Sequence, residues 1–348
     1  MLLKDYNPVS QLTVKRTEIT KPKFPVIDAH VHIGALLMKS SSDGAIDEQN
    51  DIPGVVKGLK ELGVIGIVNL KMFWGEPLTG HLKSLESHQD FIHTFASVDV
   101  SRLDEPDFAS YVARLLRDFK NMGIKGLKLW KNIGCTLKDS AGRYVRPDDD
   151  RLRPIWEEAA KHKLIVLFHI ADPKSFFTPL DEKNEFYECL VNNPSWLFYG
   201  GGRYSFEDLM EAQHNLIEKN PDTTFIIPHA GSNAENLGWV AGQLDMHPNM
   251  HIDISARINL LGRQPYTARD FCIKHQDRIL FGTDYACDEN ARSFYTQHYR
   301  FLETYDEYLK PIEEWGFSQG RWYAYGLGLP DEVLRKIYSG NAKKLLYC

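Results

Sequence analysis

Two histidines lie two positions apart in the segment Asp-Ala-His30-Val-His32. Residues i and i+2 of a β-strand point to the same side, so both imidazoles of such a pair can reach one metal ion. Two unrelated histidines near a strand end would give the same pattern, and short motifs often arise by chance. By itself the pair therefore leaves a metal site and a coincidence about equally open.

Three further ionisable residues follow apolar runs that have the composition of buried strands. His169 follows Leu-Ile-Val-Leu-Phe, His229 follows Phe-Ile-Ile-Pro, and Asp284 follows Ile-Leu-Phe-Gly-Thr. If these runs are strands of one barrel, the three side chains lie at its carboxyl-terminal mouth, where barrel enzymes carry their catalytic groups. Imidazoles and a carboxylate are suited to Zn²⁺, with Mn²⁺, Fe²⁺ or Co²⁺ as alternatives. The positions together favour a metal-dependent active site.

The elements that would hold these residues alternate between strand and helix. The expected strands are 24–29, 64–70, 91–98, 124–130, 164–170, 223–228, 251–255 and 278–283. Helical spacing of apolar residues, with recognisable ends, occurs at 107–122, 152–162, 206–219, 234–246 and 267–275. Eight strands alternating with helices, without a linker that splits them, predict an α/β fold, a single (β/α)₈ TIM barrel over 24–348 after an N-terminal extension at 1–23.

Two segments are longer than a barrel requires. Residues 171–205 separate the fifth expected strand from its helix and are rich in aromatic side chains. A long loop on the catalytic face is expected to shape the substrate pocket. Residues 308–329 form an aromatic-rich C-terminal extension. For that extension an apolar cover, a contact between two copies of the chain and a lid all remain open.

The composition is that of a globular protein of 348 residues, with 43% hydrophobic and 25% charged residues and a formal net charge of -6. That charge provides no general attraction for nucleic acid or anionic membranes. The five cysteines are scattered and form no CxxC motif, which argues against disulfides and thiolate zinc sites. We expect a cytoplasmic protein that acts on a small molecule, with a homodimer as one possible assembly. A leader removed from the sequence would leave no trace in it.

The sequence also resembles a known family. The motif Val-Ile-Asp-Ala-His-Val-His, the two strand-end histidines and the motif Arg-Ile-Leu-Phe-Gly-Thr-Asp-Tyr are similar to the amidohydrolase superfamily. Within it, the chain resembles the amidohydrolase-related branch, which includes aminocarboxymuconate semialdehyde decarboxylase and related aromatic-acid decarboxylases. The resemblance runs from about residue 25 to residue 346.

The resemblance implies roles for five residues. In the amidohydrolase-related branch one metal ion is held by the positions that correspond to His30, His32, His169 and Asp284. The position of His229 stands beside the metal and acts as an acid/base or electrophile. In hydrolytic members the aspartate that corresponds to Asp284 also takes a proton from the attacking water. One divalent ion, with Zn²⁺ favoured and Mn²⁺ as the alternative, is the cofactor expected here.

Four residues are candidates for substrate binding. Lys128 and Trp130 share a face of the fourth strand, Arg257 follows the seventh strand, and Tyr285 follows Asp284. Binuclear members of the superfamily carry a carboxylated lysine on the fourth strand, so a modified Lys128 would imply two metal ions. Otherwise Lys128 binds a substrate anion, pairs with an aspartate, or extends along the rim without a role. Arg257 suits a carboxylate, although a structural salt bridge is an equal alternative.

Asp28 has a supporting role in this interpretation. It precedes the two histidines on the same strand, at the parity that places all three on one face. We expect Asp28 to lie deeper in the barrel and to orient a ligand or a loop rather than bind the metal.

Three functions follow for testing. The first is a hydrolase in which metal-activated water attacks an amide, lactone or ester carbonyl of a small acidic substrate. The second is a nonoxidative decarboxylase that uses the same metal and the same histidine. The third is an inactive barrel that binds a ligand, because the fold alone does not imply catalysis.

Overall fold

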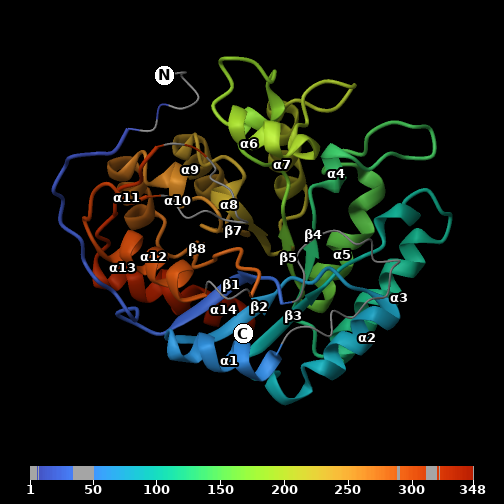
Figure 1. Cartoon of the computed structure of the whole chain (residues 1–348). Coiled ribbons are helices and arrows are strands. Elements are labelled where there is room, and N and C mark those ends of the chain that lie inside the picture. Colours follow the sequence, from blue (N-terminus) through green and yellow to red (C-terminus); the bar gives the residue numbers. More distant parts are fainter. Residues whose placement is uncertain are drawn as a thin grey trace.

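The computed structural model describes residues 6, 8–33, 51–287, 291–310, 320 and 322–347. Its eight parallel strands pair in sequence order, and the segment after the last strand returns to the first (Figure 1). There the amide of Ala29 donates to the carbonyl of Phe281 at 2.9 Å. The (β/α)₈ TIM barrel is therefore confirmed. The strands are β1 (Val26–Val31), β2 (Val64–Asn69), β3 (Ile92–Ala96), β4 (Gly126–Leu129), β5 (Ile165–Phe168), β6 (Phe225–Ile227), β7 (Met250–Asp253) and β8 (Ile279–Leu280).

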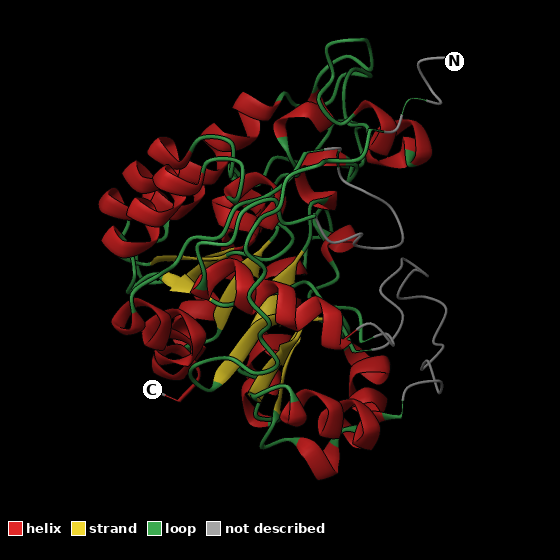
Figure 2. Cartoon of the chain, turned by 60° about the vertical axis from the view of Figure 1, so that its left-hand side comes forward, coloured by secondary structure: helices red, strands yellow, loops and turns green. Residues whose placement is uncertain are grey.

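Helices surround the strands (Figure 2). The five helices expected from apolar spacing are α3, α5, α7, α9 and α11. As predicted, α3 is followed by a glycine in the left-handed conformation, Gly123 with φ of 80°. The helices are α1 (Ile52–Glu61), α2 (Gly75–Ser84), α3 (Phe108–Asn121), α4 (Asn132–Cys135), α5 (Arg153–His162), α6 (Tyr187–Asn192), α7 (Phe206–Lys219), α8 (Pro228–Gly231), α9 (Leu237–Met246), α10 (Ile258–Leu261), α11 (Pro265–Lys274), α12 (Ala291–Glu303), α13 (Asp331–Arg335) and α14 (Asn341–Tyr347).

The barrel interior contains a compact apolar cluster. Its members come from six strands and from α14, because alternate residues of each strand point inward. They are Ile27, Ala29, Val68, Leu70, Phe95, Ile165, Leu167, Ile226, Leu280, Ala342 and Leu346. The two residues of α14 show that the C-terminal helix closes one end of the barrel. The expected metal ligands and His229 lie at or just beyond the opposite, carboxyl-terminal ends of the strands.

A β-bulge in β1 changes which of its side chains face the interior. The pairing with β2 slips between Asp28 and Val31, where three steps along β1 match two along β2. Ile27 and Ala29 face the interior cluster, whereas the Asp28 carboxylate accepts a hydrogen bond from the hydroxyl of Tyr295 on α12 at 2.6 Å. The prediction that Asp28 shares a face with the histidines is therefore wrong, because the bulge reverses the alternation before His30.

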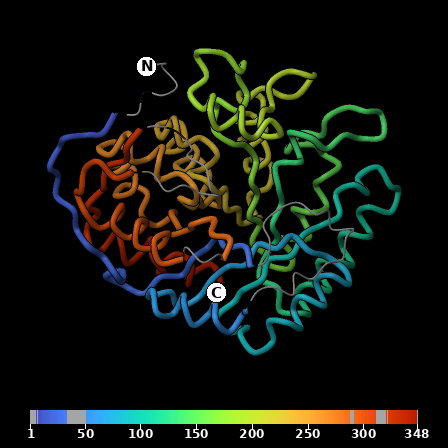
Figure 3. The backbone as a smooth tube through the Cα atoms, in the orientation of Figure 1, coloured from blue at the N-terminus to red at the C-terminus, as the bar shows by residue number. Residues whose placement is uncertain are grey.

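Three segments outside the strands and helices of the barrel pack on it. The N-terminal segment runs along the C-terminal half (Figure 3), where the amide of Thr17 donates to Asp306 at 2.6 Å. The segment 171–205 contains α6, and its Phe186 packs against Trp322 of the C-terminal extension with ring centroids 5.4 Å apart. Trp315 and Phe317 of that extension lie outside the described residues.

Two further expectations concern the described part of the chain. Cys135, Cys189 and Cys272 are free thiols, and these three and Cys287 are all buried. None of the helices in the described ranges is both long enough and apolar enough to cross a bilayer.

Candidate active site

Three side chains converge at the mouth of the barrel beside the ends of β1 and β8. The Nε2 atoms of His30 and His32 lie 3.3 and 3.1 Å from the same carboxylate oxygen of Asp284. The amide of Asp284 donates to the carbonyl of His30 at 2.8 Å, which fixes the β8 end against β1. Asp284 has φ of 66°, a left-handed conformation that is costly for a residue with a side chain and that recurs at functional sites.

The protonation states of His32 and Asp284 suit the binding of a cation. Burial lowers the pKa of His32 to about 4, so its imidazole is neutral at pH 7. Burial tends to raise the pKa of Asp284, but the adjacent His30 and His32 outweigh it and hold that pKa well below its usual range. Burial and Lys128 act to lower the pKa of His30, while Asp253 and Asp284 raise it overall.

The loop beyond β8 is anchored by the buried carboxylate of Asp28. It accepts hydrogen bonds from the amides of His30 and Thr283, at 3.0 and 3.1 Å, and from the Thr283 hydroxyl at 2.5 Å. Asp28 thus connects the histidine-bearing strand to the segment that carries Asp284. The expectation that Asp28 orients a ligand or a loop is confirmed, although its carboxylate lies on the outer side of the barrel wall, against α12.

His229 lies next to this group and is held by β7. Its Nδ1 lies 3.0 Å from the carbonyl oxygen of Ser255, and its amide donates to Asp253 at 3.0 Å. The ring centroids of His229 and His30 are 5.0 Å apart. Nε2 of His229 is buried and has no hydrogen-bond partner among the described residues. That atom is therefore available to a substrate.

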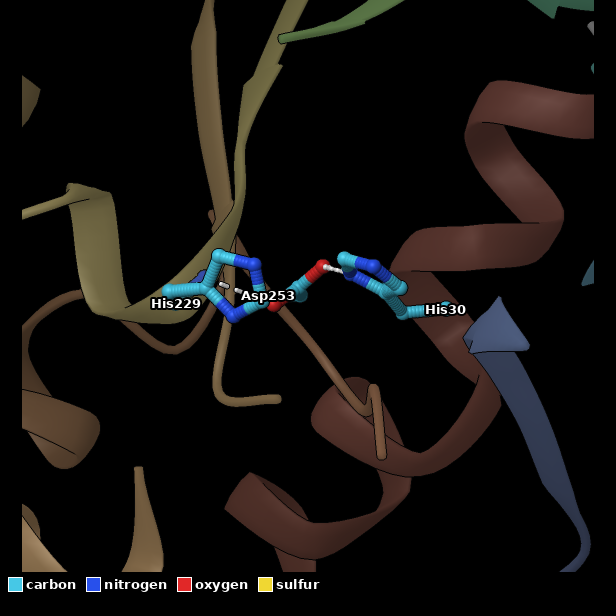
Figure 4. Close-up of side chains that lie close together, drawn as sticks. All are labelled: His30, His229 and Asp253. Atoms are coloured by element: carbon cyan, nitrogen blue, oxygen red, sulfur yellow. Dashed lines mark hydrogen bonds and ion pairs between the residues drawn. The ribbon is translucent and has the colours of Figure 1, made fainter. Parts of the chain in front are cut away.

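Asp253 sits between His30 and His229 (Figure 4). One carboxylate oxygen is 2.8 Å from Nδ1 of His30, and the other accepts from the amide of His229. Asp253 and Ser255 were not singled out in the sequence. Their signal was present, since polar and apolar residues alternate along His251-Ile-Asp253-Ile-Ser255, which indicates a strand with a polar inward face.

His169 has a different partner from the other expected ligands. Its Nε2 lies 3.2 Å from a carboxylate oxygen of Asp172, and its ring centroid is 4.3 Å from that of His229. Asp172 also pairs with Lys131. Burial lowers the pKa of His169 to about 4. The structure places His169 beside His229 but does not direct its Nε2 at the carboxylate of Asp284.

Lys128 and Arg257 bring positive charge to the same mouth. Nζ of Lys128 is buried and lies 3.4 Å from Nε2 of His30, and burial lowers the pKa of Lys128 to about 8. Arg257 is also buried, and its Nη2 is 3.9 Å from Asp172. Two buried cations thus lie beside the candidate metal ligands and give this mouth local positive charge.

The two aromatic candidates differ in position. Trp130 is half-buried at the end of β4, with the ammonium of Lys131 5.5 Å from its ring centroid. Tyr285 packs against Phe294 and Tyr295 of α12, with centroids 5.4 and 5.6 Å away. The ring of Tyr285 is thus packed against α12, and its contact with substrate stays a prediction.

The side chains at the mouth include the kinds of donor atom that a divalent ion requires. His30, His32 and Asp284 offer two nitrogens and one oxygen that all lie within 4.8 Å of one another. Such a set fits Zn²⁺ or Mn²⁺ and leaves further positions for another ligand and for water. A second group within the same limit consists of His30, His229 and Asp253. Its carboxylate is already engaged by hydrogen bonds from the protein, so the first group fits a metal better.

Known proteins agree with this architecture. The family model described as Amidohydrolase matches residues 81–347. The 2,6-dihydroxybenzoate decarboxylase from Rhizobium is 14% identical, with a TM-score of 0.56 and coverage of 93% of this chain and 98% of that one. The dihydroxybenzoic acid decarboxylase from Polaromonas sp. JS666, solved with bound manganese and the inhibitor 2-nitroresorcinol, is 14% identical, with a TM-score of 0.57 and coverage of 93% and 97%.

A third similar structure has another activity. The 4-oxalomesaconate hydratase from Rhodopseudomonas palustris is 14% identical, with a TM-score of 0.52 and coverage of 92% of this chain and 95% of that one. No curated protein matches the sequence. At these identities the solved structures establish the shared fold.

Proposed function

The chain belongs to the amidohydrolase family, and on that premise we propose that it is a metal-dependent hydrolase that acts on a small acidic substrate. The observation that carries the proposal is the convergence of His30 and His32 on one oxygen of Asp284. Two imidazoles and a carboxylate are brought together by the ends of the first and last strands. An ion that replaces these contacts would satisfy all three groups at once.

The proposed ligands are His30, His32 and Asp284, with His169 as the fourth. His169 would have to exchange its contact with Asp172 for the metal. Asp172 would remain paired with Lys131, so the exchange leaves no buried carboxylate without a partner. The ion is proposed to be Zn²⁺, with Mn²⁺ as the alternative, because both accept nitrogen and oxygen ligands.

Asp284 and His229 can then transfer the proton of the attacking water. A divalent ion bound here would supply an activated water and polarise the carbonyl under attack. Because the carbonyl of Ser255 can only accept, neutral His229 carries its proton on Nδ1 and a lone pair on Nε2. We propose that Asp284 takes the proton of the attacking water, that the lone pair of His229 Nε2 accepts this proton from Asp284, and that His229 then donates it to the leaving group. This tautomer supports proton transfer by His229 rather than an electrophilic role.

The substrate is proposed to carry a carboxylate. Lys128 and Arg257 are buried at the mouth, where Asp172 already neutralises one positive charge through Lys131. A carboxylate of the substrate would pair with the positive charge of Lys128 and Arg257. Trp130 offers a flat apolar surface at the same rim. A small planar acid, or its ester, lactone or amide, fits these features.

The second candidate is nonoxidative decarboxylation. Two of the similar solved structures carry the names of dihydroxybenzoate decarboxylases, and one was solved with manganese. In this alternative the buried cations, with a metal held by the same ligands, would bind the carboxylate that leaves as CO₂. Nε2 of His229 would first take up a proton from water and then donate it to the carbon that has lost CO₂. The two reactions need the same residues and are separated by their products.

The metal is tested first, by elemental analysis of the purified protein. We expect about one ion per chain in the wild type and a loss in His169→Ala, because removing a ligand typically weakens a metal site strongly. His162→Ala, on the outer helix α5, is the matched control and should retain the metal. About two ions per chain would indicate a carboxylated Lys128. No ion, even after reconstitution, would contradict the proposal.

The reaction is tested on acidic lactones, esters and amides and on aromatic and enoic acids. Hydrolysis products from the first set support the hydrolase, whereas CO₂ released from the second set supports the decarboxylase. His229→Ala should keep the metal and lose about 10²- to 10⁴-fold in turnover. Full turnover by that variant with normal metal content would refute the role of His229. Reconstituted protein inactive on every class would favour the ligand-binding barrel.

A further inference from the structure

We propose that Asp253 is a positioning residue that fixes the tautomer of His30, so that its Nε2 lone pair faces the metal position. Asp253 is fully buried at the end of β7 and lies far from His30 in sequence. The inference deepens the proposed function and rests on it in one respect only, which is that His30 binds a metal. The geometry of the carboxylate stands independently of that premise.

The side chain of Asp253 acts only as a hydrogen-bond acceptor in its contacts with Ser255 and His229. Oδ1 accepts from the amide and hydroxyl of Ser255, at 3.0 and 2.5 Å, and from the amide of His229 at 3.0 Å. Oδ2 is 2.8 Å from Nδ1 of His30. A carboxylate has no proton to donate, so Nδ1 of His30 must carry one. Nε2 of His30 also faces a carboxylate, that of Asp284, but at the longer distance of 3.3 Å, and it lies 3.4 Å from the ammonium of Lys128, which can only donate. The single proton of neutral His30 therefore belongs on Nδ1, and Nε2 keeps its lone pair.

Ser255 fits the same arrangement. Its hydroxyl proton is used for Asp253, so its oxygen can only accept from the two imidazole Nδ1 atoms that lie 3.0 Å away, those of His30 and His229. Its main-chain carbonyl also accepts from His229. The strand end β7 therefore holds both imidazoles in the Nδ1–H form. Only His30 depends on the side chain of Asp253 for this, because His229 has the carbonyl of Ser255.

The variant Asp253→Asn separates the two histidines. The amide oxygen of the new side chain must occupy the Oδ1 position, because three donors meet there. The NH₂ group then faces Nδ1 of His30, which must accept and move its proton to Nε2. That proton blocks the lone pair needed by the metal. The side chain keeps its shape, so packing changes little.

The experiment records ¹⁵N NMR of the imidazoles in metal-free protein, at an alkaline pH that keeps them neutral. In the wild type both His30 and His229 should carry the proton on Nδ1. In Asp253→Asn, His30 should switch to Nε2–H while His229 stays unchanged. Ser255→Ala keeps the carboxylate and the main-chain carbonyl, and both tautomers should remain as in the wild type.

The second readout is Zn²⁺ affinity by competition with a chromogenic chelator. Asp253→Asn should weaken binding by about 10- to 100-fold, the usual effect of losing a carboxylate behind a metal-ligating histidine. The inference is overturned if His30 keeps its proton on Nδ1 in Asp253→Asn. It is also overturned if His30 of the wild type carries its proton on Nε2, a result that can be obtained even if the variant does not fold. If the wild type binds no Zn²⁺ but the tautomers switch as stated, the proposed function fails while the positioning role survives.

Discussion

His298 offers a test of how burial sets acid stability in this barrel. Its imidazole is fully buried on α12 between Phe281 and Phe294, with ring centroids 5.9 and 5.0 Å away. Nδ1 donates to the carbonyl of Phe294 at 2.9 Å. Burial lowers the pKa of His298 from 6.5 to about 4. The neutral form is therefore strongly favoured in the folded protein.

The sign and size of the effect follow from linkage. The folded-state pKa is depressed, so the unfolded chain binds more protons between about pH 4 and 6.5, and stability falls as the pH falls through that window. Protonation of His298 alone removes about 2 kcal/mol between pH 7.5 and pH 5.0, and about 3 kcal/mol in full, at ~1.4 kcal/mol per pKa unit. The variant His298→Leu lacks this loss.

The assay is urea unfolding of wild type and His298→Leu at both pH values, with metal removed by a chelator. The measured quantity is the difference between the two proteins, in which the titration of every other histidine cancels. That difference should move by about 2 kcal/mol in favour of the variant at pH 5.0. His298→Gln, which is polar but does not titrate, should behave in the same way. A difference that stays constant with pH would refute the role of burial.

Three further predictions concern the strands, a helix and the metal. Gly126→Ala should abolish folding into soluble protein, because a Cβ there would lie 2.5 Å from a backbone oxygen of β5. Gly58→Ala is the control: a Cβ there has nothing within 4 Å, so the variant should be neutral or should stabilise α1 by about 0.5–1 kcal/mol in urea unfolding. Ser205→Ala removes one half of the capping box of α7 and should cost about 1 kcal/mol by the same assay. In thermal unfolding, Zn²⁺ at about 100-fold its Kd should stabilise the wild type by about 2.7 kcal/mol. Asp284→Asn should lose this gain and the surface control Asp277→Asn should keep it; equal gains in both variants would contradict the ligand assignment.

The sequence determined the architecture and most of the rim. Strand and helix periodicities are local properties, so the eight strands and the principal helices could be located from apolar spacing. The same reasoning placed His30, His32 and Asp284 where strands end. It also placed His229 and His169 there, because polar groups after buried runs have few structural explanations.

The tertiary structure decided which atoms meet. The bulge that turns Asp28 outward depends on the pairing of β1 with β2, and no spacing within β1 reveals it. The carboxylate of Asp253 reaches His30 across 223 positions of sequence, and His169 contacts Asp172 in preference to Asp284. Side-chain contacts of this kind depend on the closure of the barrel, which brings distant strands to one mouth. Periodicity fixes the direction of a side chain along its own strand, but only packing fixes its partner.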